Sequence, residues 1–216
     1  MTKIGIIACE TLKREIDHVI QGDPSIVHVE YLEFGLHTWP AELRKAVVER
    51  VNNLEGKVDA VLLGYGICNS LQEITTMVRV PTVRFDVDDC VGCLMTTDGY
   101  NRERKVCAGT FFATPAFCDM GTEWFKKELR KNMPNYEELG IDEKWFLERM
   151  FDGYSRVLYI DPGLEGRDEF ERKSMRFAEE LKLRHESCVG TLDVIREALE
   201  QTKKLALVNQ KDVAED

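Results

Sequence analysis

The seven cysteines of this 216-residue chain are the residues that suggest chemistry, because three of them follow runs typical of buried strands. Cys9 ends the run KIGIIAC, Cys68 follows VDAVLLGYG, and Cys90 follows PTVRFDV. Three converging thiolates can bind zinc with one coordination position open, or an iron–sulfur cluster with one iron free. We therefore predict a metal site of Cys9, Cys68 and Cys90. The alternative is that these cysteines are small apolar core residues.

A histidine, an aspartate and two glycines accompany these cysteines. His37, in GLHTWP, lies between a predicted strand and a predicted helix, and we expect a fourth ligand or a general acid or base there. A loop imidazole bonded to the backbone is the alternative. Asp89, next to the third cysteine, is expected to orient a ligand or move a proton, unless it belongs to a solvated loop. Gly64 and Gly66 are expected to let a bulky group approach Cys68.

The composition excludes several classes of protein. Charged residues make up 31% of the chain and the formal charge is −10, so no nucleic-acid partner is expected. No apolar run is long enough to cross a membrane, and no membrane partner is expected. The start MTKIGIIAC reads as a strand rather than a signal peptide, which predicts a cytoplasmic protein. An odd number of cysteines without an export signal argues against a disulfide framework.

Short strand-like runs alternate with helical patterns along the whole chain. The strand candidates are residues 3–9, 27–34, 58–66, 81–87, 109–117, 156–161 and 184–190. The helix candidates are residues 12–20, 40–54, 70–78, 120–133, 142–154, 168–183 and 191–208. This alternation predicts an α/β fold with a mostly parallel, doubly wound sheet. In such a sheet, ligands bind at the carboxyl ends of the strands, where the three cysteines and His37 would meet.

The expected domain organisation is one compact unit over residues 1–216, or two Rossmann-like lobes, 1–100 and 101–216. The stretch 88–106 is expected to be the lobe boundary or a functional loop, and residues 211–216 a frayed acidic tail. No phosphate loop, dinucleotide fingerprint or nucleophile elbow is present, so no motif supports nucleotide-dependent chemistry.

Several ordered segments resemble the DUF1638 family. They are IIACETLKREI, LEFGLHTWPAELRKAV, VLLGYGICNS and FDVDDCVGCLM, followed by GTFFATPAF, and together they span most of the chain. The resemblance implies that the family's functional positions are Cys9, His37, Cys68, Asp89 and Cys90. In the family, an apolar residue is commoner at the position of Cys93, so the cysteine pair of CVGC is not a feature that the family shares. The resemblance carries over nothing for Cys107, Cys118 and Cys188.

The resemblance also suggests a pathway. Similar family members occur in methanogens and other anaerobes, often near genes for corrinoid-dependent methyl transfer. It implies a role in methyl-group (C1) metabolism, with a corrinoid protein or a methyltransferase as partner and a small-molecule substrate of unknown identity. A zinc ion held by three thiolates can activate a substrate thiol for alkylation, because coordinated sulfur stays deprotonated yet nucleophilic.

Three other functions remain open at this point. An iron–sulfur cluster with a free iron site would suit a lyase, a desulfidase or electron delivery. A cofactor-independent racemase would place Cys68 opposite Cys188 as acid and base, and leaves Cys9 and Cys90 without a role. A non-enzymatic accessory protein would only hold a metal or a corrinoid. The spacing of the cysteines does not separate zinc from iron.

Overall fold

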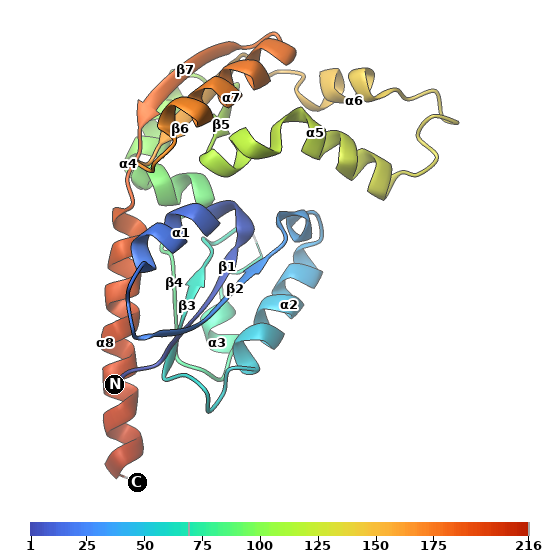
Figure 1. The fold of residues 1–216 in the computed structure, drawn as a ribbon. Helices are drawn as coiled ribbons and strands as arrows, with labels where there is room; N and C mark the ends of the chain where they lie inside the picture. Colours follow the sequence, from blue (N-terminus) through green and yellow to red (C-terminus); the bar gives the residue numbers. More distant parts are fainter. Residues whose placement is uncertain (69, 216) are drawn as a thin grey trace. The chain divides into compact units, whose positions relative to one another are not determined.

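The computed structural model describes the backbone of residues 1–68 and 70–215, and it divides the chain into two compact units (Figure 1). Unit 1 comprises Met1–Thr97 and Thr191–Asp216, and unit 2 comprises Asp98–Gly190. Every paired strand in both units is parallel to its neighbour, which confirms the predicted α/β fold. The C-terminal segment belongs to unit 1, although a lobe of residues 101–216 would have placed it in the second.

Unit 1 contains a four-stranded sheet with the order β2-β1-β3-β4. Its strands are β1 (Ile4–Cys9), β2 (Ile26–Leu32), β3 (Ala60–Gly64) and β4 (Thr82–Arg84). The two central strands are apolar runs without alternation because both of their faces are covered. From β1 the chain passes to β2 on one side of β1, and it then returns to β3 on the other side of β1. The carboxyl ends of β1 and β3 therefore form the topological switch point.

The helices of unit 1 cover both faces of this sheet (Figure 1). On one face lie α1 (Lys13–Ile20) and α8 (Asp193–Glu215), and on the other lie α2 (Pro40–Asn52) and α3 (Ile74–Met77). The α8 side buries small residues such as Ala60 and Ala206, which let the helix approach the strands closely. The α2 side buries Ile7, Cys9, Leu63 and Tyr65 in one hydrophobic cluster with residues of α2 and α3.

Unit 2 contains a three-stranded sheet with the order β5-β6-β7. Its strands are β5 (Thr110–Ala113), β6 (Arg156–Asp161) and β7 (Arg184–Val189), and its helices include α5 (Pro115–Asn132), α6 (Glu143–Met150) and α7 (Arg167–Glu180). The core is aromatic: the Phe111 ring lies 5.5 Å from Phe151 and 4.9 Å from Phe177, between centroids.

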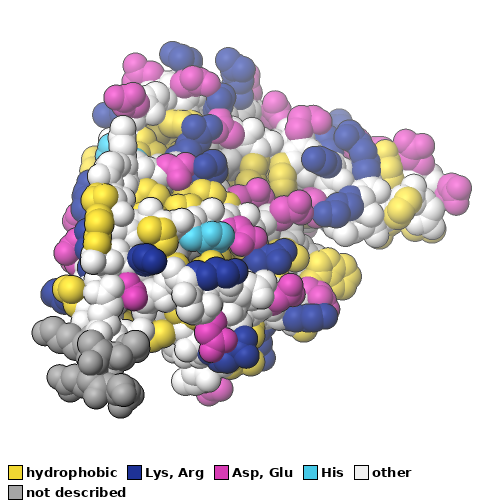
Figure 2. Space-filling model, turned by 60° about the horizontal axis from the view of Figure 1, so that its bottom comes forward, with side chains coloured by type: hydrophobic (Ala, Val, Ile, Leu, Met, Phe, Trp, Pro, Cys, Tyr) yellow, Lys and Arg dark blue, Asp and Glu magenta, His cyan; other side chains and the backbone are white. Residues whose placement is uncertain are grey.

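Figure 2 shows one face of the molecule, on which acidic and basic side chains are interspersed.

Four elements differ from the sequence prediction. The stretch 88–106 contains the expected boundary, since the first segment of unit 1 ends at Thr97 and unit 2 begins at Asp98, but it forms helix α4 (Cys90–Val106) rather than a loop, interrupted where Thr96 has a φ of 61°. Helix α3 covers only part of 70–78. Helix α5 begins at Pro115, whose fixed φ suits the first helical position, and continues through a break at Gly121. Helix α8 continues to Glu215 where a frayed tail was expected. No helix in the described residues is long and apolar enough to cross a bilayer.

Candidate functional site

The three cysteines of the predicted site lie at the carboxyl ends of adjacent strands in unit 1. Cys9 is the last residue of β1 and is 3% exposed. Cys68 lies in the loop that follows β3, and Cys90 is the first residue of α4, in the segment that follows β4; both are half-buried. Because β1 and β3 form the switch point, Cys9 and Cys68 lie at the edge where open α/β sheets bind ligands.

The electrostatic environment links these three thiols. Burial raises the pKa of the Cys9 thiol. The pKa of Cys68 is raised to about 12, first by burial and then by the charges of Asp89 and Cys9. Burial also raises the pKa of Cys90, and the charges of Cys9, Asp89 and Cys68 add to it. Each thiolate would therefore oppose ionisation of the others. Without a bound metal ion, all three cysteines stay protonated at neutral pH.

His37 is placed against the first of these thiols. It lies in the short helical turn Phe34–Thr38, and its Nε2 atom is 3.6 Å from the Cys9 sulfur. The imidazole packs between the rings of Phe34 and Tyr65, with centroid distances of 5.2 and 5.9 Å. Burial among these rings lowers the pKa of His37. At physiological pH the imidazole is therefore neutral, and its Nε2 can act as a metal ligand or accept a hydrogen bond from the Cys9 thiol. On the other side of Cys9, the Thr11 hydroxyl donates to its sulfur at 3.1 Å.

Cys68 has an unusual backbone conformation. Its φ is 44°, in the left-handed region that non-glycine residues occupy at a cost of about 1 kcal/mol or more. The conformation is held by two backbone hydrogen bonds to the loop after β4: Ile67 N donates to Val87 O at 2.9 Å, and Cys68 N donates to Asp88 O at 2.8 Å. The loop therefore fixes the position of the cysteine against its backbone preference.

Gly64 and Gly66 permit close packing of the protein on itself. A Cβ atom at Gly64 would lie 2.4 Å from the Cβ of Ala8 on β1. A Cβ atom at Gly66 would lie 2.7 Å from Val87 O and 2.9 Å from Asp89 N. The space around these glycines, which we expected to admit a ligand, is filled by β1 and by the loop before α4. Their contribution to the site is to bring the segments that carry Cys68 and Asp89 together.

Asp89 starts the helix that carries the third cysteine. Its Oδ1 accepts hydrogen bonds from Val91 N at 2.9 Å and Gly92 N at 3.0 Å, which satisfies two amides of the first turn of α4. This capping fixes Cys90 as the first helical residue. The Asp89 charge also raises the pKa of both Cys68 and Cys90, so the carboxylate lies within electrostatic range of both thiols.

Three residues near this edge that contain buried polar atoms were missed by the sequence analysis. The Tyr65 hydroxyl, Arg84 Nη1 and both carboxylate oxygens of Glu15 are buried and have no hydrogen-bond partner among the described residues. Buried polar groups are rarely left without a partner, and each one requires an explanation. Two signals in the sequence were available: an arginine inside a predicted strand, and a glutamate on the inward face of a predicted helix.

Glu15 gives a prediction about pH. It is 0% exposed, and burial raises its pKa from 4.5 to about 7. Between these values the folded protein binds a proton that the unfolded chain has lost, so this residue's contribution to stability falls as pH rises. Above pH 7, ionisation of Glu15 lowers the free energy of unfolding by about 3 kcal/mol relative to acidic pH. We expect Glu15→Gln, which does not ionise, to be more stable than wild type at pH 8 by about this amount and similar to it at pH 4.5.

Denaturant unfolding of both proteins across this pH range measures the difference directly. Glu55→Gln is the matched control, because Glu55 is exposed and pairs with Arg79 at the surface. Equal pH dependence in wild type and Glu15→Gln would show that Glu15 finds a compensating partner in solution.

The other four cysteines are not members of the predicted site, although Cys93 follows Cys90 by one turn of α4 and its backbone N donates to Asp89 O at 3.2 Å. Cys93 is fully buried, and its pKa is raised by burial and then by the charge of Glu15. Cys107, Cys118 and Cys188 belong to unit 2. Among the described residues, no group of three or more His, Cys, Asp or Glu side chains is arranged to hold a metal ion. Ligation by the three cysteines would thus require their side chains to reorient.

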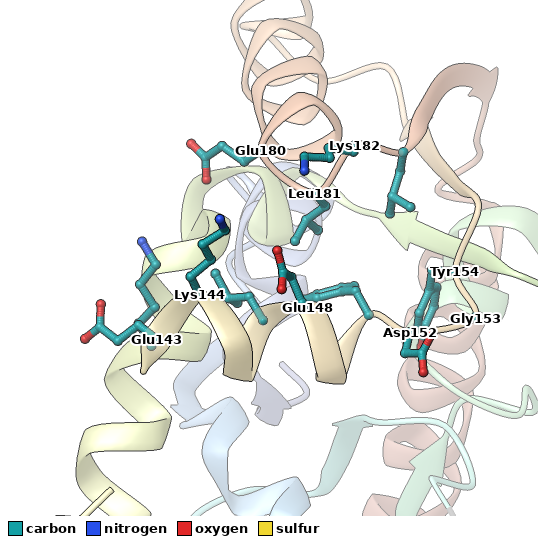
Figure 3. A pocket seen from close by; sticks show the side chains of 13 residues that line it. Glu143, Lys144, Glu148, Asp152, Gly153, Tyr154, Glu180, Leu181 and Lys182 are labelled. Atoms are coloured by element: carbon teal, nitrogen blue, oxygen red, sulfur yellow. The ribbon is translucent and has the colours of Figure 1, made fainter. Parts of the chain in front are cut away.

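Unit 2 carries a hollow of about 710 Å³ between α6 and the end of α7. Figure 3 shows Lys144 and Glu148 of α6 extending toward the end of α7, where Glu180 and Lys182 lie. The lining mixes acidic and basic side chains with apolar ones and contains neither cysteine nor histidine. This hollow therefore has none of the thiol chemistry of the edge in unit 1.

Comparison with known families identifies the family of this chain. A family model described as "Protein of unknown function (DUF1638)" matches residues 31–199. The matched region includes His37, Cys68, Asp89 and Cys90, and it begins after Cys9. No curated protein matches the chain.

Proposed function

The chain belongs to the DUF1638 family, and we propose that it is a metal–thiolate protein that binds zinc or an iron–sulfur cluster through Cys9, Cys68 and Cys90. The observation that carries the proposal is the position of Cys9, Cys68 and Cys90 at the carboxyl ends of adjacent strands of the unit 1 sheet, with His37 Nε2 3.6 Å from the Cys9 sulfur. Three protonated thiols gathered at a ligand-binding edge are the donor set that a soft cation needs, because the cation replaces the protons and removes the repulsion between thiolates.

The surroundings of Cys9 support a role for His37 in this chemistry. In a tetrahedral zinc site, a thiolate sulfur and an imidazole nitrogen lie about 3.6 Å apart, given bonds near 2.3 and 2.1 Å. The Cys9 sulfur and His37 Nε2 are separated by 3.6 Å. The same distance suits transfer of the thiol proton to the neutral imidazole. We favour the second role, with His37 as acid and base and Asp89 as the residue that fixes the start of α4.

The proposed reaction class is methyl-group transfer linked to a corrinoid. When bound, a zinc held by three thiolates would keep a substrate thiol deprotonated and nucleophilic. His37 would accept the proton that this thiol loses. The partner would be a corrinoid protein or a methyltransferase, and the location the cytoplasm. An iron–sulfur cluster in the same place would instead support lyase or desulfidase chemistry.

Metal analysis of the wild-type protein, purified without oxygen, tests the proposal. We expect zinc or iron at about one site per chain, with visible absorbance only if a cluster is present, because zinc is d¹⁰ and colourless. Chelator treatment should lower thermal stability, since metal binding and folding are coupled. Metal-free protein that takes up neither zinc nor iron and sulfide would contradict the proposal and leave the cysteines as core residues.

A further inference from the structure

Two hydrogen-bond donors without a partner lie on the same side of the unit 1 sheet as Cys9. Tyr65 is 2% exposed, and its hydroxyl has no partner among the described residues; Arg84 Nη1 is likewise buried and has none. A buried donor left unpaired costs about 1–3 kcal/mol, and more when it is charged. Two such donors at one edge indicate that a polar ligand satisfies them.

The backbone places both donors together. In the β3–β4 pairing, Leu63 lies opposite Arg84, and Leu63 belongs to the hydrophobic cluster on the α2 side together with Cys9 and Tyr65. Side chains of paired residues project to the same face of a sheet, so Arg84 projects to the α2 side. Beyond this pair, Phe85 N donates to Tyr65 O at 3.2 Å. The two side chains therefore belong to adjacent segments at the carboxyl edge.

Both donors also lie within electrostatic range of the thiols. The Arg84 guanidinium partly offsets the increase in the pKa of Cys68. The pKa of Tyr65 is raised by burial and then by the charges of Cys9 and Cys68. The geometry agrees, because the Tyr65 ring lies 5.9 Å from the imidazole of His37, whose Nε2 is 3.6 Å from the Cys9 sulfur. A ligand that binds to Arg84 and Tyr65 would thus have its remaining atoms near the thiols.

The neighbouring carboxylates already accept hydrogen bonds from backbone amides. Glu10 accepts a hydrogen bond from Phe34 N at 2.6 Å, and Asp89 accepts two from the first turn of α4. A guanidinium and a phenol offer donors for an oxyanion, and a cationic ligand would be repelled by Arg84.

We propose that Arg84 and Tyr65 bind an anionic oxygen group, a carboxylate or a phosphate, of a small molecule whose reactive end lies at the thiols. That the molecule reacts there rests on the proposed function; the anion site itself requires no metal. If the protein catalyses methyl transfer, as proposed above, the substrate is a small thiol with an acidic group. The Arg84 guanidinium and the Tyr65 hydroxyl bind the acidic group of this substrate, and the substrate's sulfur lies toward Cys68.

The test uses simple probes on the purified full-length chain, as isolated and after chelator treatment. Acetate and sodium phosphate are titrated at constant ionic strength, with chloride as the reference salt, and the melting temperature is followed. Wild type should be stabilised by at least one of the two anions. Arg84→Gln should weaken this apparent affinity about tenfold or more, the loss expected for a hydrogen bond to a charged group. The stronger of the two responses identifies a carboxylate or a phosphate ligand.

Tyr65→Phe separates ligand binding from a structural role. Removing an unpaired buried hydroxyl should leave the melting temperature without anion unchanged or raise it, while the anion response decreases. Arg79→Gln is the matched control, since Arg79 is an exposed arginine that pairs with Glu55 and should respond like wild type. The proposal is overturned if neither anion stabilises wild type, or if Arg84→Gln and Tyr65→Phe both respond as fully as the control.

The substrate class is tested separately with mercaptoacetate and 2-mercaptoethanol, which share a thiol and differ in the acid. On metal-loaded protein, mercaptoacetate should bind about tenfold more tightly, and Arg84→Gln should remove the difference. If the protein holds no metal but still binds acetate or phosphate through Arg84, the proposed function fails and the anion site stands. Equal binding of both thiols would overturn the acidic substrate.

Discussion

Replacing Cys68 by alanine is expected to remove most of the metal from protein purified without oxygen. Cys68 is one of three cysteines at the carboxyl ends of adjacent strands, and it is held at a φ of 44° by hydrogen bonds to the loop after β4. With one thiolate gone, the remaining donors hold a soft metal much more weakly. Zinc and iron per chain, measured on wild type and variant prepared in parallel, give the result.

Cys107→Ala is the matched control for this loss. Cys107 is a half-buried cysteine of unit 2, and its sulfur contacts the Ser155 hydroxyl at 3.2 Å. This variant should keep the wild-type metal content. Cys68→Ser adds a second test, because it preserves the size of the side chain but supplies a poorer ligand for a soft metal. Full metal content in both Cys68 variants would exclude Cys68 as a ligand and leave its backbone conformation without a functional explanation.

His37→Ala is expected to leave most of the metal in place while lowering reactivity toward thiols or methyl donors about 10²- to 10⁴-fold, the usual range for loss of a general acid or base. The imidazole is kept neutral by burial between Phe34 and Tyr65, and its Nε2 faces the Cys9 sulfur at 3.6 Å. A neutral base beside a protonated thiol can accept a proton without first losing one.

Metal content and reactivity must be measured on the same preparation to interpret this variant. If His37 is a fourth ligand, its loss should strip the metal and lower the melting temperature, because a closed site couples metal binding to folding. That result would make the centre structural rather than catalytic. His28→Ala serves as the control. His28 lies on β2, where its Nε2 is 3.7 Å from a carboxylate oxygen of Glu30, and we expect neither metal content nor reactivity to change.

The local sequence determines several features of this protein. The uninterrupted apolar runs of β1 and β3 require strands that are covered on both faces, and hence a parallel sheet with helices on each side. Once that sheet is expected, the position of Cys9 at the end of a run places it at the ligand-binding edge. Pro40 and the spacing of Leu43, Val47 and Val51 likewise determine where α2 begins and which of its faces is buried.

Only the tertiary structure reveals the environment of these cysteines. The left-handed conformation of Cys68 depends on hydrogen bonds to Val87 and Asp88, residues distant in the sequence, and the glycines beside it serve this close approach. The unpaired groups of Tyr65 and Arg84 are visible only after every neighbour is in place. Periodicity predicts which face of an element is buried. Whether a buried donor finds a partner depends on side chains from other elements, and short-range patterns carry no information about those.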